Sequence, residues 1–314
     1  MFNSSMYDIV GDIHGHCEAL KSLLLKLGYT RDGSSWGHPD RKVIFVGDYI
    51  DRGPKIPETL ELVRSMTDND QAIALMGNHE LNAILFNEKD GEGGYVRPRT
   101  QKNIDQHKHT LEQFEVRAKG LEEYEEYIHW FRSLPMTWEN EYLRAVHATW
   151  HPESVEALED HAARIREHGE YLARAGDPHH ELWSLTETLL KGIEESLPEG
   201  VTFTDKHGTQ RDEMRIKWWK DPAQTPIEHY GFDADLSGHA GKTASDLVTN
   251  RWHYEDRKPV FFGHYWLRGE PALQSPYVCC LDYSIGKKEK LAAYRYDGEE
   301  ELYAEKLVWV EYVS

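Results

Sequence analysis

The chain has little cysteine, no long apolar run and a shortage of positive charge. Only three of its 314 residues are cysteines, Cys17, Cys279 and Cys280. A sparse, odd set with two adjacent members does not make a disulfide framework, so it favours a reducing compartment and predicts a cytoplasmic protein. No apolar stretch reaches the roughly 18 residues of a membrane helix. The N-terminal residues lack the basic and apolar regions of a secretory leader, so we expect neither a span nor a leader.

The shortage of basic residues limits the partners that the chain can bind. Lysine and arginine number 36 against 55 acidic residues, which gives a formal net charge of −19. A surface this acidic repels polyanions, so duplex nucleic acid and anionic membranes are not expected as partners. Carboxylates that bind divalent cations account for part of the excess, and a solvated acidic surface accounts for the rest. Hydrophobic residues at 39% suit a globular protein of this length, with one large domain or two smaller ones.

Three short polar blocks near the start of the chain each follow a run of β-forming residues. The blocks are Gly11-Asp12-Ile13-His14-Gly15, Gly47-Asp48-Tyr49-Ile50-Asp51-Arg52-Gly53 and Gly77-Asn78-His79-Glu80, and the preceding runs are 7–10, 43–46 and 72–76. Each block therefore places metal-binding or acid–base side chains at the C-terminal end of a predicted strand. In an open α/β sheet that edge is where ligands bind. Three such edges within a short stretch of chain predict one shared site.

The segments between and after these blocks predict the fold class and the domain organisation. Helices are expected over 16–27 and 57–66 and from 81 onward, and their alternation with strands indicates an α/β core with right-handed crossovers. A helical insertion is expected over 87–135. A mostly helical cap, with helices over 155–168 and 181–195, is expected over 151–255. The chain returns to strand patterning at 260–262, which favours one domain over 1–314, although a separate cap domain is the alternative. The tail, 277–313, predicts antiparallel strands with Asp297-Gly298 as a hairpin turn.

The first two blocks and the start of the third carry the side chains that hard and borderline divalent metals prefer. Asp12 and His14 lie two residues apart at a strand end, where both side chains point the same way and reach one ion. Asp48 follows the next strand, and its two carboxylate oxygens suit a bridge between two ions. Asn78 offers an amide oxygen to the second ion.

Two further histidines are expected to complete the second ion's ligand set. His147 and His264 are the best placed of the 18 histidines, because each directly follows an apolar, strand-like run. A histidine in such a place is more often a core or surface residue, so this assignment depends on the three earlier blocks.

Two metal ions roughly 3.5–4 Å apart clamp a phosphoryl group and turn a bound water into a nucleophile. Direct attack by a metal-bridging hydroxide then needs no covalent intermediate with the enzyme. His79 is expected to point into the site without binding metal and to act as general acid towards the leaving oxygen. Asp51 is expected to hold the other ring nitrogen of His79. The planar fork of Arg52 suits phosphate oxygens.

Taken together, the blocks resemble the calcineurin-like metallophosphoesterases, and among them the bacterial PPP-type serine/threonine phosphatases and the symmetrical diadenosine tetraphosphate hydrolases. The resemblance rests on GDIHG, GDYIDRG and GNHE, on His147 in Ala-Val-His-Ala and on His264 in Gly-His-Tyr-Trp. It implies a calcineurin-like four-layer α/β/β/α sandwich with a cap insertion. It also implies that Asp12, His14 and Asp48 hold one ion and that Asp48, Asn78, His147 and His264 hold the other. Trp266 stands where many superfamily members have another histidine, which matches the PPP branch.

The resemblance identifies the substrate-binding residues less completely than it identifies the metal ligands. It implies a second phosphate-binding arginine between the last two histidines, for which Arg211, Arg215 and Arg251 are candidates and Arg215 is preferred, beside Arg52 and Asn78. Trp218 and Trp219 next to Arg215 would stack on a nucleobase or, alternatively, pack the cap's own core. The chain also departs from the family with His147-Ala148-Thr149 in place of His-Gly-Gly and with Asp282-Tyr283-Ser284 in place of Asp-Thr-Gly.

Three functions follow from these patterns. The first is a dinuclear-metal phosphomonoesterase of the PPP-like protein serine/threonine phosphatase type, which would act on a phosphoprotein. The second is a pyrophosphohydrolase of bis(5'-nucleosyl) tetraphosphates, favoured by aromatic and basic residues in the cap. The third, a non-enzymatic scaffold, conflicts with the complete set of ligand and acid–base residues. Mn²⁺ is the preferred metal, with Fe, Zn, Ni and Co as alternatives, because mixed Asp, His and Asn ligand sets accept all of them. No pattern identifies a partner protein.

Overall fold

The computed structural model describes residues 6–33, 35–204 and 210–312, and the chain divides into two compact units. The first unit comprises Met1–Leu190 and Lys258–Ser314, and the second comprises Lys191–Arg257. The second unit therefore begins inside the segment expected to form a cap and ends two residues beyond it, whereas the first forty or so residues of that segment belong to the first unit. Val313, the expected end of the tail strands, lies outside the described residues.

A five-stranded sheet in the first unit carries the strands that precede the three polar blocks. Its order is β16-β15-β1-β4-β5. The strands are β1 (Tyr7–Val10), β4 (Lys42–Phe45), β5 (Ala72–Ala74), β15 (Lys290–Tyr296) and β16 (Leu307–Glu311). Strands β1, β4 and β5 are parallel, while β15 and β16 run antiparallel to their neighbours. The three blocks thus leave the sheet at one edge, as predicted.

A second sheet of the first unit packs against the five-stranded sheet. Its order is β14-β13-β7-β6, and its strands are β6 (Thr137–Glu139), β7 (Arg144–Val146), β13 (Val260–Phe262) and β14 (Val278–Cys280). Side chains of both sheets form one buried cluster, in which the ring of Phe261 lies 5.1 Å from that of Tyr294. Burial of such large apolar side chains is the main stabilising term of the unit. The predicted mixed α/β fold is confirmed.

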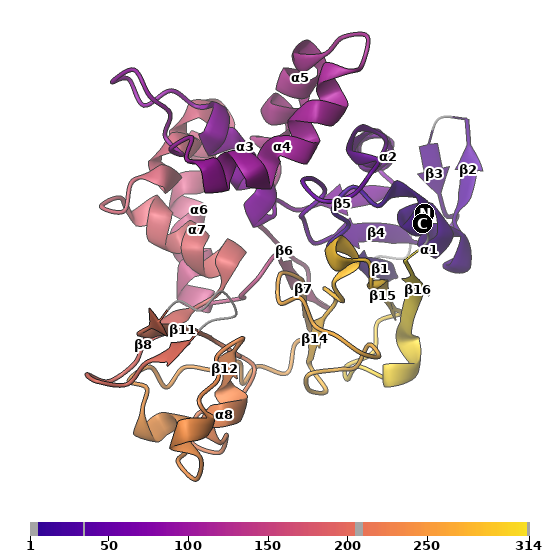
Figure 1. Cartoon of the computed structure of the whole chain (residues 1–314). Coiled ribbons are helices and arrows are strands. Elements are labelled where there is room, and N and C mark those ends of the chain that lie inside the picture. The colour runs from indigo at the N-terminus through magenta and orange to yellow at the C-terminus, as the bar shows by residue number, and fades with distance from the viewer. Residues whose placement is uncertain (1–5, 34, 205–209, 313–314) are drawn as a thin grey trace. The chain divides into compact units, whose positions relative to one another are not determined.

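Helices follow the strands and form the rest of the first unit (Figure 1). They are α1 (Cys17–Lys26), α2 (Ile56–Asp68), α3 (Asn78–Asn87), α4 (Gln101–Glu115), α5 (Leu121–Phe131), α6 (Pro152–Glu167), η1 (Gly169–Gly176) and α7 (Glu181–Lys191), with the short elements β2 (Thr30–Asp32), β3 (Ser35–Gly37), η4 (Ile285–Lys287) and η5 (Ala304–Lys306). Helix α1 buries Leu20, Leu23 and Leu24 on one side, as its apolar periodicity predicts. Helices α4 and α5 pack together and occupy the segment expected to be a helical insertion.

The second unit has a small aromatic core of its own. Its elements are β8 (Glu194–Ser196), β9 (Phe203–Thr204), β10 (Gln210–Arg211), β11 (Glu213–Ile216), α8 (Ile227–Tyr230), β12 (Gly231–Phe232), η2 (Ser237–His239) and η3 (Ala244–Asp246). Trp218 is fully buried, stacked on Trp252 and edge-on to Trp219 and Tyr254. Of the two alternatives for this tryptophan, core packing is correct and nucleobase stacking is wrong.

Three sequence-based expectations about secondary structure are wrong. The helix expected over 181–195 ends at Lys191, because Gly192 adopts a φ of +94° and the chain continues into β8. Asp297-Gly298 is not a two-residue hairpin turn, since β15 ends at Tyr296 and β16 begins only at Leu307. The side chain of Asp297 instead forms ion pairs with Arg41 and Lys306. Strand β14 also departs from the expected antiparallel tail, because it runs parallel to β13 in the other sheet.

No helix among the described residues combines the length and the apolar character needed to cross a bilayer.

Candidate metal centre

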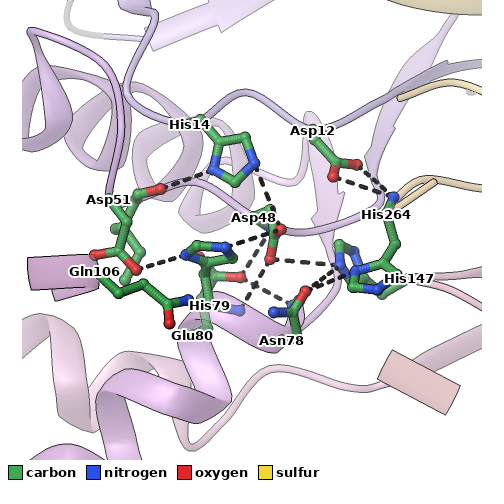
Figure 2. Close-up of polar contacts among 12 residues, drawn as sticks. Asp12, His14, Asp48, Asp51, Asn78, His79, Glu80, Gln106, His147 and His264 are labelled. Atoms are coloured by element: carbon green, nitrogen blue, oxygen red, sulfur yellow. Dashed lines mark hydrogen bonds and ion pairs between the residues drawn. The ribbon is translucent and has the colours of Figure 1, made fainter. Parts of the chain in front are cut away.

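The loops after six strands bring their polar side chains together in the first unit (Figure 2). Asp12 and His14 follow β1, Asp48 follows β4, and Asn78 and His79 begin α3 after β5. His147 follows β7, His264 follows β13, and Asp282 lies two residues beyond β14. All of these side chains are buried. The structure therefore places all six of the residues predicted as metal ligands in one cluster.

Two of the histidines hold one ring nitrogen with a backbone carbonyl and direct the other at oxygen atoms. His147 Nδ1 lies 2.7 Å from the carbonyl oxygen of Val46 and donates to it, which leaves Nε2 as the ligand atom. That Nε2 faces Asn78 Oδ1 at 3.0 Å and Asp48 Oδ1 at 3.4 Å. His14 repeats the arrangement, with Nδ1 donating to the Ile50 carbonyl at 2.9 Å and Nε2 lying 3.6 Å from Asp48 Oδ2. Backbone carbonyls that fix one ring nitrogen and leave the other facing oxygen ligands are typical of metal-binding histidines, so the donor set fits metal ions.

Asp48 lies between two groups of ligand atoms. In the described part of the chain, His14, Asp48 and His79 form one group, and Asp48, His147 and His264 form another, each with ligand atoms within 4.8 Å of one another. Oδ2 of Asp48 faces His14 and Oδ1 faces His147, so the two oxygens are directed to different groups. His264 Nδ1 lies 2.8 Å from Asn78 Oδ1, which adds the amide oxygen to the second group.

Asp12 is held by a backbone amide rather than by another side chain. Its two carboxylate oxygens accept from the backbone N–H of His264 at 3.2 and 3.1 Å. The close approach depends on Gly263, because a Cβ atom at that position would lie 1.9 Å from Asp12 Oδ1. Gly77 plays the same part beside Asp48, where a Cβ atom would lie 2.3 Å from Oδ1.

The electrostatics of the cluster show an excess of buried negative charge. Burial, together with the neighbouring Asp282, raises the pKa of Asp12 well above its usual value. Burial would also raise the pKa of Asp48, but His147 and His79 bring it well below the usual range. Burial lowers the pKa of His14 to about 3. For His147 burial would act the same way, but the Asp48 carboxylate outweighs it and raises the pKa to about 10. Divalent cations would balance these carboxylates.

Four residues of the site adopt left-handed backbone conformations, which residues other than glycine rarely adopt. The φ angles are +48° for His14, +57° for Asp48, +85° for Asp51 and +67° for His264. Such conformations cost about 1–3 kcal/mol each and persist where surrounding contacts hold them. These strained conformations lower the stability of the folded protein, but they direct the side chains into the site.

The residues predicted to handle the proton and the phosphate lie beside this cluster. His79 Nδ1 donates to Asp51 Oδ2 at 2.5 Å, and its Nε2 lies 3.9 Å from Asp48 Oδ2. Burial would lower the pKa of His79, but the Asp48 and Asp51 carboxylates outweigh it and raise the pKa. Arg52 is exposed, and its guanidinium has no hydrogen bond or ion pair among the described residues. Its side chain lies near His14, because a Cβ at Gly286 would contact Arg52 Cδ at 2.6 Å and His14 Cδ2 at 2.8 Å.

Glu80 has a role in the site that was not assigned from the sequence. Its Oε2 accepts from the backbone N–H groups of Asp48 and Gly77 at 2.8 and 2.9 Å, and its Oε1 accepts from that of Tyr49 at 2.8 Å. Burial and the nearby Asp48 raise the pKa of Glu80 to about 7. The spacing of Gly77 and Glu80, that of a helix capping box, was the available signal.

Helix α4 also contributes residues that no motif indicated. His107 and Thr110 both contact the Asp51 carboxylate, at 2.6 and 2.7 Å. They lie in the segment expected to be a helical insertion. No predicted strand or glycine-rich turn stands next to them in the sequence, so nothing identified them as functional residues. Asp282 was missed as well, although its place after a strand is the same signal that marked Asp12 and Asp48.

Arg215, the preferred second phosphate-binding arginine, lies on β11 of the second unit. Its guanidinium pairs with Glu194 at 3.1 Å. Its contact with a substrate stays a prediction.

Comparisons with known proteins match most of the chain to one family and a shorter segment to individual relatives. The family model described as calcineurin-like phosphoesterase matches residues 7–265. A protein of Geobacillus sp. (strain WCH70), named bis(5'-nucleosyl)-tetraphosphatase PrpE, asymmetrical, is 47% identical over 73 residues, which are 23% of this chain and 30% of that protein. A protein of the same name from Halalkalibacterium halodurans is 43% identical over 74 residues, again 23% and 30% of the two chains. The matched segment is therefore less than a third of these relatives' length.

Similar solved structures extend over most of the chain at low identity. One is titled a putative diadenosine tetraphosphatase, with 16% identity, a TM-score of 0.49 and coverage of 99% of this chain and 96% of that one. Another, a cold-active protein-tyrosine phosphatase of Shewanella sp., has 16% identity, a TM-score of 0.47 and coverage of 95% and 80%.

Proposed function

We propose that this chain, which belongs to the calcineurin-like phosphoesterase family and is a metal-dependent hydrolase, cleaves phosphoric esters at the cluster around Asp48. The observation that carries the proposal is the position of Asp48, whose two oxygens face two separate groups of imidazole and amide ligands. One carboxylate shared between two such groups suits a pair of divalent ions.

The ligand assignment follows the two groups except in the first, where Asp12 takes the place of His79 and His79 is kept as the proton donor. We propose that Asp12, His14 and Asp48 hold one ion and that Asp48 holds the second with Asn78, His147 and His264. Two ions bound there would activate a water as nucleophile and offset the charge of the phosphoryl group. Mn²⁺ is our first choice, and Fe, Zn, Ni and Co suit the same mixture of oxygen and nitrogen ligands.

The remaining polar groups handle the leaving group and the phosphate. His79 donates a proton to the leaving oxygen, and Asp51 fixes its ring and favours its protonated form. This role is supported by the 2.5 Å contact between His79 Nδ1 and Asp51 Oδ2. Arg52 binds phosphate oxygens, a role supported by its uncommitted guanidinium near His14. Asn78 completes the proposed substrate contacts of the first unit, and Arg215 stays our candidate for the second phosphate-binding arginine.

Our proposed substrates are phosphate monoesters, in particular phosphorylated serine or threonine of proteins. The second candidate is a bis(5'-nucleosyl) tetraphosphate, favoured because the relatives that match part of this chain carry the name of such a hydrolase. The burial of Trp218 removes one argument for the nucleotide, since this side chain packs inside the second unit. Free, buried thiols at all three cysteines are in keeping with our proposal of a cytoplasmic location.

A substrate panel on the metal-loaded protein tests the proposal. The panel is p-nitrophenyl phosphate, a phosphoserine peptide, a diadenosine tetraphosphate and bis-p-nitrophenyl phosphate, each with Mn²⁺, Fe²⁺, Zn²⁺, Ni²⁺ or Co²⁺. We expect metal-dependent turnover of the two monoesters. Turnover of the dinucleotide alone would replace the first substrate class by the second. No turnover with any of these metals would contradict both.

A further inference from the structure

Helix α4 contacts Asp51, the partner of the proposed proton donor His79, through His107 and Thr110. We infer that His107 is a positioning residue, which fixes the Asp51 carboxylate so that His79 keeps one orientation towards the leaving oxygen. This inference rests on the proposed function, because it concerns how the leaving group receives its proton.

The Asp51 carboxylate is held by three side-chain donors. Its Oδ2 accepts from His79 Nδ1 at 2.5 Å, while its Oδ1 accepts from His107 Nδ1 at 2.6 Å and from Thr110 Oγ1 at 2.7 Å. Asp51 and His107 are each only 4% exposed. Two imidazoles therefore contact opposite oxygens of one buried carboxylate. Only the first of them lies beside the proposed metal ligands.

The hydrogen bonds beyond His107 specify which nitrogen carries its proton. Tyr124 OH lies 2.6 Å from Asn87 Nδ2 and 2.6 Å from His107 Nε2. The Asn87 amide can only donate, so the tyrosine oxygen accepts there and directs its own proton to Nε2. His107 then accepts from Tyr124 at Nε2 and directs its Nδ1 proton at Asp51.

The same helix also holds the backbone of the loop that carries Asp51. Asp51 has a φ of +85°, and its N–H donates to Thr110 Oγ1 at 3.1 Å, so Thr110 contacts both its backbone and its carboxylate. Gln113 donates to the Gly53 carbonyl at 2.9 Å and accepts from the Ile56 N–H at 2.7 Å. His107, Thr110 and Gln113 are spaced by three along α4, so one stripe of the helix faces this loop.

These contacts predict what happens when His107 is removed. Oδ1 would keep only the Thr110 donor, and the carboxylate could turn about its own axis away from His79. A small misplacement of a general acid slows the reactions that need its proton and leaves the others nearly unchanged. The effect of His107 should therefore depend on the leaving group.

The test compares p-nitrophenyl phosphate, which has a good leaving group, with phenyl phosphate, which has a poor one. For His107→Ala on the Mn²⁺-loaded full chain we expect kcat to fall about 10-fold or more with phenyl phosphate and less than about 3-fold with p-nitrophenyl phosphate. Metal content should not change. His107→Asn keeps an N–H donor for Asp51 and should recover most of the loss. His109→Ala, a substitution of an exposed histidine on the same helix, is the matched control.

A double variant separates positioning from a structural role. If His107 acts through His79, adding His107→Ala to His79→Asn should slow phenyl phosphate hydrolysis no further. A structural role would instead lower the rates of both substrates equally and add to the loss in His79→Asn. Either result would overturn the inference. If His107→Ala does not fold, Tyr124→Phe serves in its place, with a smaller loss expected for phenyl phosphate alone.

A readout without turnover keeps this inference separate from the proposed function. Long-range ¹H–¹⁵N spectra of the histidine rings should show the proton of His107 on Nδ1, directed at Asp51. A proton on Nε2 would contradict the inference even if the wild-type protein hydrolyses the panel as proposed. Absence of wild-type turnover with every metal, in contrast, marks failure of the proposed function itself.

Discussion

The strand-end loops and helix α4 meet at the same site but contribute to it in different ways. The loops after β1, β4, β7 and β13 present carboxylate and imidazole groups whose lone pairs converge. Helix α4 presents N–H and O–H donors to one carboxylate, that of Asp51. Ligand atoms demand particular residue types at fixed places on a sheet edge, whereas positioning donors can come from any element that packs nearby. The predictions below test whether this division between metal binding and positioning holds.

Asp48→Asn should have the largest effect, because it removes a charge and one of the two oxygens that face the two ligand groups. We expect loss of at least one ion and a fall in kcat of about 10³-fold or more. Metal analysis of the purified variant, alongside steady-state kinetics, provides the check. Two retained ions with near wild-type turnover would show that Asp48 is not the shared ligand.

His79→Asn should have the next largest effect and should leave the metals in place. We expect about a 10²–10³-fold loss with phenyl phosphate and a smaller loss with p-nitrophenyl phosphate, because only the first needs a proton on its leaving oxygen. The measurement is the same pair of rates together with metal content. If the variant loses metal instead, His79 belongs with the loops as a ligand, in keeping with its place near Asp48 in Figure 2.

Glu80→Gln tests the hydrogen bonds that hold the backbone of the loops rather than the metal ligands themselves. All three groups that Glu80 accepts from are backbone N–H groups, so a glutamine NH₂ must face at least one of them. We expect the free energy of unfolding to fall by about 1–3 kcal/mol, measured by urea denaturation. Glu115→Gln, an exposed substitution, is the control. Equal stability of the two variants would mean that Glu80 does not hold the loops.

Gln113→Ala should have the smallest effect, because it removes a bridge between two backbone groups of the 51–56 loop without touching a ligand. A loss of about 1 kcal/mol in the free energy of unfolding is expected, with unchanged metal content. Loss of a metal ion in this variant would show that α4 also shapes the metal centre, contrary to the division proposed here.

The strand-end loops and helix α4 also differ in how well their contributions to the site can be predicted from the sequence. Asp12, Asp48 and Asn78 stand directly after runs of β-formers, and parallel strands deliver their ends to one edge, so their meeting follows from local patterns. His107 contacts Asp51 across 56 positions of the chain. That contact depends on how α4 packs, which no local pattern encodes. The left-handed φ of Asp51 was equally unpredictable, because contacts from α4 hold it.

The second unit shows the same limit on a larger scale. Its pair of tryptophans lies beside basic residues, which suggested either stacking on a nucleobase or packing in the unit's own core. Only the burial of the side chains decides between the two interpretations. The prediction for the tail was wrong for a related reason: Asp-Gly favours a hairpin, but the strand that pairs with β15 begins only at Leu307, which depends on tertiary pairing.

The central claim is that Asp48 is shared by two metal ions. A crystal structure of the Mn²⁺-loaded protein, with anomalous difference density recorded for manganese, tests it most directly. We expect two peaks roughly 3.5–4 Å apart, one beside Asp12 and His14 and the other beside Asn78, His147 and His264, with an oxygen of Asp48 bound to each. A single peak, or two peaks that Asp48 does not join, would contradict it.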